Sequence, residues 1–202
     1  MGLRTAILDR LAAAAAHQDA EDRRRLLASF ARVGTDVRIG RLPEVYSAEC
    51  IELGDRVSIG NFVRLQAIRT RAGVDFEPLI RLGADVSLEN GCTITCNNRV
   101  LIDDGVLVAG NVYISDHAHV YADVETPVAR QPITTGGVVR IGAGSHIGQN
   151  VCILGDVAIG EHVVVGANAV VTRDLPARTV AVGAPARVVR RYEEESRSWV
   201  HV

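Results

Sequence analysis

Aliphatic residues recur every six positions along the second half of the chain. The series is Ile141, Ile147, Ile153, Ile159, Val165 and Val171. Neither the 3.6-residue period of an amphipathic helix nor the two-residue period of an alternating strand explains this spacing. A six-residue period is typical of a β-helix, in which each unit is one short strand and one turn. We therefore expect stacked coils that bury one continuous aliphatic core.

The same register appears upstream and contains two interruptions. It begins near Val33, is irregular over residues 66–80, and continues to Ile114. The larger interruption, between Ile114 and Ile141, contains histidines, acids, arginines and prolines. We expect a corner or small loop at the first interruption. A long insertion in a regular solenoid is usually functional or disordered, so the second is the candidate functional loop.

Glycine often follows the repeating aliphatic residue. The glycines after the last regular units are Gly142, Gly148, Gly160 and Gly166. We expect them to permit backbone angles that a side chain would oppose.

Both ends of the chain predict helices. Apolar stripes predict helix over residues 3–32, with a kink near His17, and this helix would cover the exposed strand edges of the first coil. Pro185 begins a second predicted helix that extends to Glu195. The expected organisation is a helical segment over 1–32, a β-helix over 33–184 with a loop over 117–138, and a C-terminal helix and tail over 185–202.

Composition agrees with one all-β domain. The chain has 202 residues, of which 48% are hydrophobic and 4% aromatic, and this suits a narrow interior of Ile, Val and Ala. A net charge of −2 gives no support for nucleic-acid binding. No segment predicts a signal peptide or a membrane span, so we expect a cytoplasmic protein.

The four cysteines do not have the spacing of a zinc site or a disulfide framework. They are Cys50, Cys92, Cys96 and Cys152. Cys92 occupies a repeat position that favours a small buried residue. We therefore expect free thiols in the core.

The segment from Ile141 to Arg191 carries a specific resemblance. It contains the motifs VVTRDLP and VGAPARVVR, and the tract SDHAHVY precedes it. These motifs closely resemble the hexapeptide-repeat acyltransferases, in particular the branch that acetylates sugars and glycans, near the galactoside and maltose acetyltransferases. The resemblance implies a left-handed parallel β-helix with three hexapeptides per coil. It also implies acetyl-CoA as acyl donor and a homotrimer with active sites between subunits.

A hydroxyl acceptor needs a general base, and histidine suits this role at neutral pH. The resemblance places the catalytic base at His117 and makes His119 and Asp116 acceptor-site candidates. Asp116, Asp103 and Asp104 are candidates to orient the imidazole. Adjacent side chains on an extended backbone diverge, and this argues against Asp116 in that orienting role.

Coenzyme A needs a groove for its pantetheine arm and cations for its phosphates. The resemblance assigns the groove to Gly148, Gln149, Gly166, Ala167 and Thr172. It assigns the phosphates to Arg173, Arg187 and Arg190, because arginine binds phosphate in a two-pronged geometry. A backbone N–H from Ala143–Gly144 or from Gly148 would stabilise the oxyanion.

Three other functions stay open at this point. An N-acetyltransferase would act on an amino sugar or a xenobiotic amine. Serine is a less expected acceptor, since the serine-specific relatives carry a larger helical N-terminal domain. A metalloenzyme like the γ-class carbonic anhydrases needs three histidines around a metal, and we expect no metal here. A non-catalytic scaffold would bind acetyl-CoA without turnover.

Overall fold

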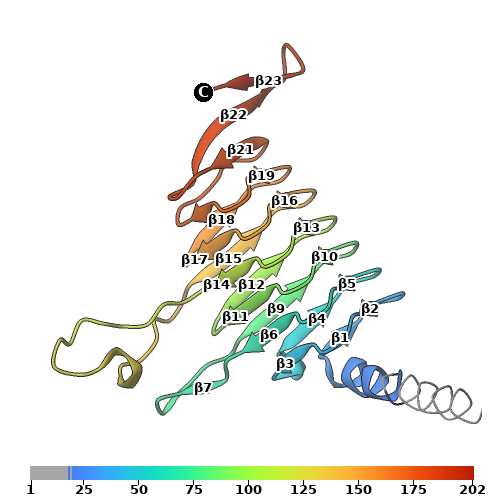
Figure 1. Cartoon of the computed structure of the whole chain (residues 1–202), viewed down its shortest axis with the longest axis vertical. Coiled ribbons are helices and arrows are strands. Elements are labelled where there is room, and N and C mark those ends of the chain that lie inside the picture. The colour runs from blue at the N-terminus through green and yellow to red at the C-terminus, as the bar shows by residue number, and fades with distance from the viewer. Residues whose placement is uncertain (1–17, 19) are drawn as a thin grey trace, which may run out of the picture.

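Three mainly parallel sheets form the sides of a prism in the computed structural model, which describes residue 18 and residues 20–202. The chain contributes one strand to each sheet in turn and then begins the next coil (Figure 1). Strands of successive coils pair in parallel on every side. This is the stacked architecture that the six-residue period predicts.

The first sheet contains β1 (Arg32–Val33), β4 (Ile51–Leu53), β9 (Leu79–Leu82), β12 (Arg99–Ile102), β15 (Val138–Ile141) and β18 (Val157–Ile159). The second contains β2 (Arg38–Ile39), β5 (Ser58–Ile59), β10 (Ser87–Leu88), β13 (Leu107–Val108), β16 (His146–Ile147), β19 (Val164–Val165), β21 (Thr179–Val182), β22 (Arg187–Glu193) and β23 (Ser198–His201). The third contains β3 (Glu44–Tyr46), β6 (Arg64–Ala67), β11 (Thr93–Cys96), β14 (Tyr113–Ser115), β17 (Cys152–Leu154) and β20 (Val170–Val171).

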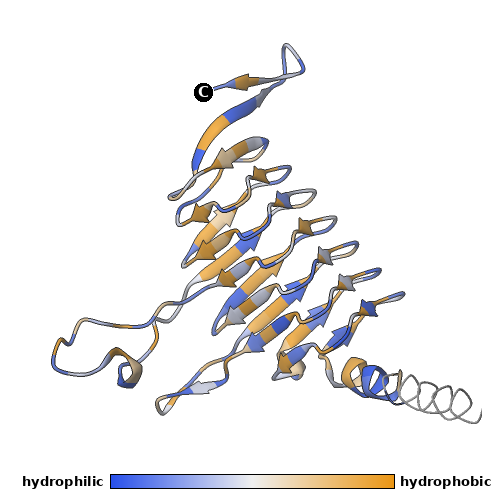
Figure 2. Cartoon of the chain, viewed as in Figure 1, coloured by the Kyte–Doolittle hydropathy of each residue, from blue (hydrophilic) through white to orange (hydrophobic). Residues whose placement is uncertain are grey.

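The predicted inward positions form the core. Equivalent residues of successive coils are in register, as in the stack of Leu65, Ile94, Ile114, Ile153 and Val171 on the third sheet. Each of these five side chains is at most 1% exposed. The six residues of the regular series are likewise buried, so the repeat prediction is confirmed. Figure 2 shows the hydrophobic strand positions recurring from coil to coil.

The glycines after the inward residues have a different role from the one expected. Gly142, for example, does not have a positive φ, but a Cβ there would lie 2.5 Å from the backbone of Gly160 and Glu161 in the next coil. The corners of adjacent coils therefore approach too closely for a side chain. The prediction of unusual backbone angles was wrong, and the physical reason for glycine is steric contact between stacked corners.

Two insertions leave the prism. The irregular segment after β6 forms an antiparallel hairpin of β7 (Thr70–Arg71) and β8 (Val74–Asp75). The candidate functional loop runs from the end of β14 to the start of β15 and contains the short 3-10 helix η2 (Val128–Arg130). Both insertions project from the same side of the prism (Figure 1). The loop matches the predicted range, except that Val138 already belongs to β15.

The N-terminal helix packs against the first coil. It is described over residues 20–29, and Leu26, Leu27 and Phe30 contact the core. The helix ends before Arg32, which begins β1, so the predicted range was too long at this end. A second 3-10 helix, η1 (Ala48–Cys50), lies beside this junction, where Ala31 donates its N–H to the carbonyl oxygens of Ala48 and Ile51. The predicted start of the helix and its kink near His17 lie outside the described residues.

The predicted C-terminal helix was wrong. Residues 187–193 form β22, which pairs antiparallel with β21, and β23 continues the hairpin. Val188 and Val189 favour extended backbone because they are β-branched. The edge of β21 also offers unpaired backbone groups that a helix could not satisfy. Tyr192 and Trp199 meet edge to face across the hairpin, with ring centroids 5.6 Å apart.

Two further expectations bear on the described chain. All four cysteines are free, as predicted, but only Cys92 and Cys96 are buried in the core, whereas Cys50 and Cys152 are half-buried. No helix in the described residues has the length and apolarity to cross a membrane. The left-handed sense of the coil stays a prediction.

Candidate active site

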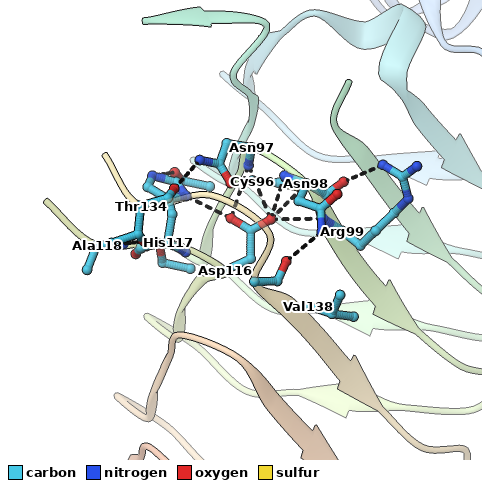
Figure 3. A network of polar contacts seen from close by, with 12 residues as sticks. Cys96, Asn97, Asn98, Arg99, Asp116, His117, Ala118, Thr134 and Val138 are labelled. Atoms are coloured by element: carbon cyan, nitrogen blue, oxygen red, sulfur yellow. Dashed lines mark hydrogen bonds and ion pairs between the residues drawn. The ribbon is translucent and has the colours of Figure 1, made fainter. Parts of the chain in front are cut away.

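Asp116 is the buried centre of a polar network at the base of the loop. Its carboxylate accepts the backbone N–H groups of Asn97, Asn98 and Arg99 at 2.8–3.2 Å. These three residues form the corner after β11, so their successive amides point to one place (Figure 3). A carboxylate held by several backbone donors is well suited to a buried position. Asp116 is 1% exposed and therefore does not face an acceptor, contrary to its expected place in the acceptor site.

His117 binds to this carboxylate through its side chain. Its Nδ1 lies 2.7 Å from Oδ1 of Asp116. The expectation that neighbouring side chains would diverge was wrong, because β14 ends at Ser115 and the chain turns there. The hydroxyl of Ser115 donates to the carbonyl oxygen of His117 and stabilises this turn. A carboxylate only accepts hydrogen bonds, so in the neutral imidazole Nδ1 carries the proton and Nε2 is the hydrogen-bond acceptor.

Nε2 of His117 faces the outer surface of the third sheet. The hydroxyl of Thr95 lies 3.3 Å from this nitrogen, from the adjacent strand β11. With Nε2 unprotonated, this hydroxyl is the donor. It thus marks the direction from which an acceptor hydroxyl would approach.

The base of the loop is closed around the network. The backbone N–H of Thr134 donates to the carbonyl oxygen of Ala118, and the N–H of Ala118 donates to the hydroxyl oxygen of Thr134. The carbonyl oxygen of Thr134 accepts the side-chain amide of Asn97 at 2.7 Å. Asn98 donates its side-chain amide to the carbonyl oxygen of Gly137. At Gly137 a Cβ would lie only 1.9 Å from the carbonyl oxygen of Asp116, so a side chain cannot fit there. The two ends of the loop are therefore packed against the site.

Cys96 adds a thiol to the same cluster. Its Sγ lies 3.2 Å from Oδ2 of Asp116. Burial raises the pKa of the Cys96 thiol, and the nearby negative charge of Asp116 raises it further. The thiol therefore stays protonated and donates to the carboxylate.

His117 and His119 line one pocket, called here the histidine pocket. It lies over β6, β11 and β14, between the hairpin and the loop. Its lining residues are Arg64, Gln66, Ile68, Arg71, Thr93, Thr95, Tyr113, His117, His119 and Ile133. His119 is positioned by an antiparallel bridge to Ile133 across the base of the loop. The structure thus brings together the two histidines that the sequence predicted.

Several residues of this site were missed in the sequence. Thr95, Asn97 and Asn98 belong to the tract TITCNNRV, where a core strand ends in a run of polar residues. That run was a usable signal, because it lies one coil before the histidine loop. Arg64 and Arg71 carried no comparable signal, since each resembles an ordinary exposed arginine in a chain with 22 of them.

The other proposed partners of the imidazole have different roles. Asp103 pairs with Arg140 at 3.0 Å, and Asp104 accepts the backbone N–H of Ala84. Both were wrong as orienting residues for His117. Two candidate oxyanion donors were also wrong, because the N–H of Gly144 donates to Asp104 and that of Gly148 donates to Val165. Ala143 stays a prediction.

The residues predicted to bind coenzyme A lie at two corners of the later coils. Gly148–Gln149 and Gly166–Ala167 stack on each other, and Gly166 also contacts Val182. Val182 pairs with Arg187 and Val180 with Arg190, so β22 continues this corner. Thr172 and Arg173 lie at the C-terminal end of β20, on the side of the third sheet where β14 also ends before His117. The glycine corners lie on the other side, where the strands of this sheet begin. The structure does not bring these two sets into direct contact.

The described residues contain no group of three or more His, Cys, Asp or Glu side chains that could hold a metal. The three-histidine site that the metalloenzyme alternative requires is therefore not found among them. His117 and His119 share the histidine pocket, and Nδ1 of His117 is already bound to Asp116.

Known proteins share both the sequence pattern and the fold. A model of the bacterial transferase hexapeptide family, with six repeats, matches residues 139–173. An Escherichia coli protein assigned to lipopolysaccharide biosynthesis as an O-acetyl transferase, WbbJ, is 31% identical over 74% of this chain and 76% of its own length.

Solved structures give the same result for the fold. The N-acyltransferase AntD of Bacillus cereus superposes with a TM-score of 0.72 over 87% of this chain and 91% of its own, at 20% identity. Galactoside acetyltransferase in complex with coenzyme A superposes with a TM-score of 0.60 over 88% and 74%, at 26% identity. From the repeat match and the extent of its similarity to WbbJ, this chain belongs to the hexapeptide-repeat acetyltransferase family and is an acyltransferase.

Proposed function

We propose that the protein transfers an acetyl group from acetyl-CoA to a hydroxyl of a sugar or glycan precursor, with His117 as general base. The observation that carries this proposal is the 2.7 Å contact between Nδ1 of His117 and Asp116. In the neutral imidazole this contact places the proton on Nδ1, so that Nε2, 3.3 Å from the hydroxyl of Thr95 in the histidine pocket, can accept a proton. The relatives named for O-acetyl transfer to lipopolysaccharide and for galactoside acetylation support a sugar acceptor.

The reaction needs no covalent enzyme intermediate. The acceptor hydroxyl donates its proton to Nε2 of His117 as its oxygen attacks the thioester carbonyl carbon. The carbon–sulfur bond then breaks, and the leaving thiolate takes the proton from the imidazolium. Holding the acceptor and acetyl-CoA in one complex supplies most of the rate advantage of direct transfer, because the reacting atoms are already oriented. Asp116 accepts from Nδ1 throughout and stabilises the imidazolium that forms.

The donor is proposed to occupy the later coils. Gly148, Gly166 and Arg187 lie in successive layers of one corner, where Gln149 and Ala167 are exposed beside the two glycines. Arg187 and Arg190 are exposed and have no ion pair among the described residues, so they are available to bind phosphates. Thr172 and Arg173 stay predicted contacts on the edge nearer His117.

Three chains are proposed to assemble with shared sites. The histidine pocket encloses about 210 Å³ in one chain, below the range of roughly 300–1,000 Å³ usual for ligand pockets. Large apolar side chains are also exposed on two sheets, Tyr113 and Leu154 on the third and Leu107 on the second. A neighbouring subunit would cover these side chains and complete the walls of the pocket.

A screen for acetyl-CoA consumption tests the function. The panel contains neutral sugars, amino sugars, serine and chloramphenicol, with His117→Ala as the inactive control. Hydroxylamine distinguishes the products, because it cleaves esters but not amides. Labile product from sugars and none from the control supports the proposal. Stable product formed only from amines would establish the N-acetyltransferase alternative instead.

A further inference from the structure

The histidine pocket contains two cationic side chains that the proposed acetyl transfer does not use. Arg64 lies on β6, and Arg71 lies on the projecting hairpin. Both line the pocket together with His117 and His119. No aspartate or glutamate is among the lining residues, although Glu44, outside this lining, pairs with Arg64 across 3.6 Å.

Arg64 is held in position but keeps unused hydrogen-bond donors. Its guanidinium carbon lies 5.3 Å from the ring centre of Tyr46, and its Nε lies 3.6 Å from a carboxylate oxygen of Glu44. The second distance is too long for a hydrogen bond, and Nε is buried with no hydrogen-bond partner. Because Nε is buried beside Glu44, a ligand would meet the two terminal nitrogens, which make no hydrogen bond to the described residues. A fixed, flat guanidinium of this kind is well suited to bind an oxyanion.

Arg71 faces the same pocket without a carboxylate partner in the described part of the chain. The nearby acids of this region are engaged elsewhere: Asp75 accepts the hydroxyl of Thr70 at 2.8 Å, and Glu49 pairs with Arg69 at 3.1 Å. An arginine without a carboxylate partner beside a pocket keeps its full charge available to a ligand.

The position of the two arginines separates them from the donor side. On the third sheet, β11 and then β6 lie beyond β14 toward the N-terminal coils. The residues predicted to bind coenzyme A lie beyond β14 in the opposite direction, on the later coils. An anion held by Arg64 and Arg71 would therefore belong to the acceptor and not to the phosphates of coenzyme A.

From this arrangement we infer that the acceptor carries a negatively charged group, a phosphate or a carboxylate, that Arg64 and Arg71 bind while its hydroxyl lies at His117. This inference rests on the proposed function, because it assigns the class of acceptor to that same pocket. Gln66 and Tyr113 supply further polar groups between the arginines and the histidines. Arg64 and Arg71 are thus specificity-determining residues.

Binding measurements test this inference independently of catalysis. Glucose 1-phosphate, glucuronic acid and methyl glucoside are titrated by calorimetry into the full-length protein, so that phosphate, carboxylate and neutral probes share one ring. Arg64→Gln and Arg71→Gln remove the charges, Arg64→Lys keeps one, and Arg24→Gln removes an exposed arginine of the N-terminal helix as a control. Circular dichroism verifies that each variant is folded.

We expect at least one charged probe to bind about 10- to 100-fold more tightly than the neutral one, the value of one or two charge-assisted contacts. Each glutamine variant should lose most of that preference, while Arg64→Lys keeps part of it and Arg24→Gln all of it. The charged probe that binds more tightly identifies the acceptor's anionic group as a phosphate or as a carboxylate. Equal binding of all probes, no binding of charged probes at millimolar concentration, or a preference that survives in the double glutamine variant overturns the inference. An anion preference that depends on the two arginines, found together with no acetyl transfer to any compound of the acceptor panel, would establish the anion site and refute the proposed function.

Discussion

Nδ1 of His117 lies 2.7 Å from Oδ1 of Asp116, although the two residues are adjacent in the chain. The contact exists because β14 ends at Ser115 and the carboxylate is already fixed by the amides of Asn97, Asn98 and Arg99. The preceding coil therefore positions the imidazole of His117 through its own backbone. The first two predictions follow from this relationship.

Replacing His117 by alanine should lower kcat by roughly 10²–10⁴-fold, the usual range for loss of a general base. The KM for acetyl-CoA should change little, because Nε2 faces the acceptor side. His119→Ala should lower kcat less and raise the KM for the acceptor, since His119 lines the same pocket without contacting Asp116. Steady-state kinetics on both variants measure this. If His119→Ala is the inactive variant and His117→Ala turns over normally, the two roles must be exchanged.

Replacing Asp116 by asparagine should lower kcat by up to about 10⁴-fold, because an amide no longer selects the Nδ1–H form of His117. Asp116→Ala should in addition lower the free energy of unfolding by about 3–5 kcal/mol, since it removes the acceptor of the buried N–H of Asn97, of the half-buried N–H groups of Asn98 and Arg99, and of the Cys96 thiol. Kinetics and urea titrations measure the two effects. Asp103→Asn, at an ion pair outside the site, is the control and should retain activity. Full activity of Asp116→Asn would show that the imidazole needs no orienting carboxylate.

Replacing Arg187 and Arg190 by alanine should weaken binding of coenzyme A more than binding of its dephospho form. Loss of one charge-assisted contact costs on the order of 1.5–3 kcal/mol. Calorimetric titration of both ligands into each variant measures the difference. Equal weakening of the two ligands would show that these arginines contact a different phosphate or are structural.

The assembly should be a trimer in solution. Light scattering at micromolar concentration is expected to give about three times the chain mass of 21.6 kDa. Leu107→Glu or Leu154→Glu, on exposed apolar positions, should reduce this mass and the activity together. A monomer with full activity would contradict a site shared between subunits.

The pH dependence of stability should contain a contribution from Cys92. Burial raises the pKa of this thiol from 9.0 to about 11. The folded state therefore keeps the proton more strongly than the unfolded chain, and stability present below pH 9 is lost as the pH rises toward 11. Urea titrations of the wild type and Cys92→Ala between pH 8 and pH 11 should show a steeper decline in the wild type. Parallel declines would mean that the thiol titrates normally.

The repeat and the histidine loop could be predicted because they depend on local periodicity. Ile141 and its successors repeat at a period that only stacked coils satisfy, and they are buried as expected. The loop is visible as the longest break in that period. The C-terminal hairpin was missed because Ala186, Val188, Val189 and Tyr192 fit one face of a helix, whereas pairing with the open edge of β21 decided the outcome.

By itself, the sequence determined the six-residue coil, the position of its functional loop, and the two histidines that line the pocket. Tertiary structure alone decided that Asp116 contacts His117, that the amides after β11 hold that carboxylate, and that Arg64 and Arg71 reach the same pocket from an earlier coil and a hairpin. The physical reason is the separation along the chain of the residues that make each contact. A repeat is encoded by neighbouring residues, but contacts between coils depend on which corners stack and where the insertions leave the prism.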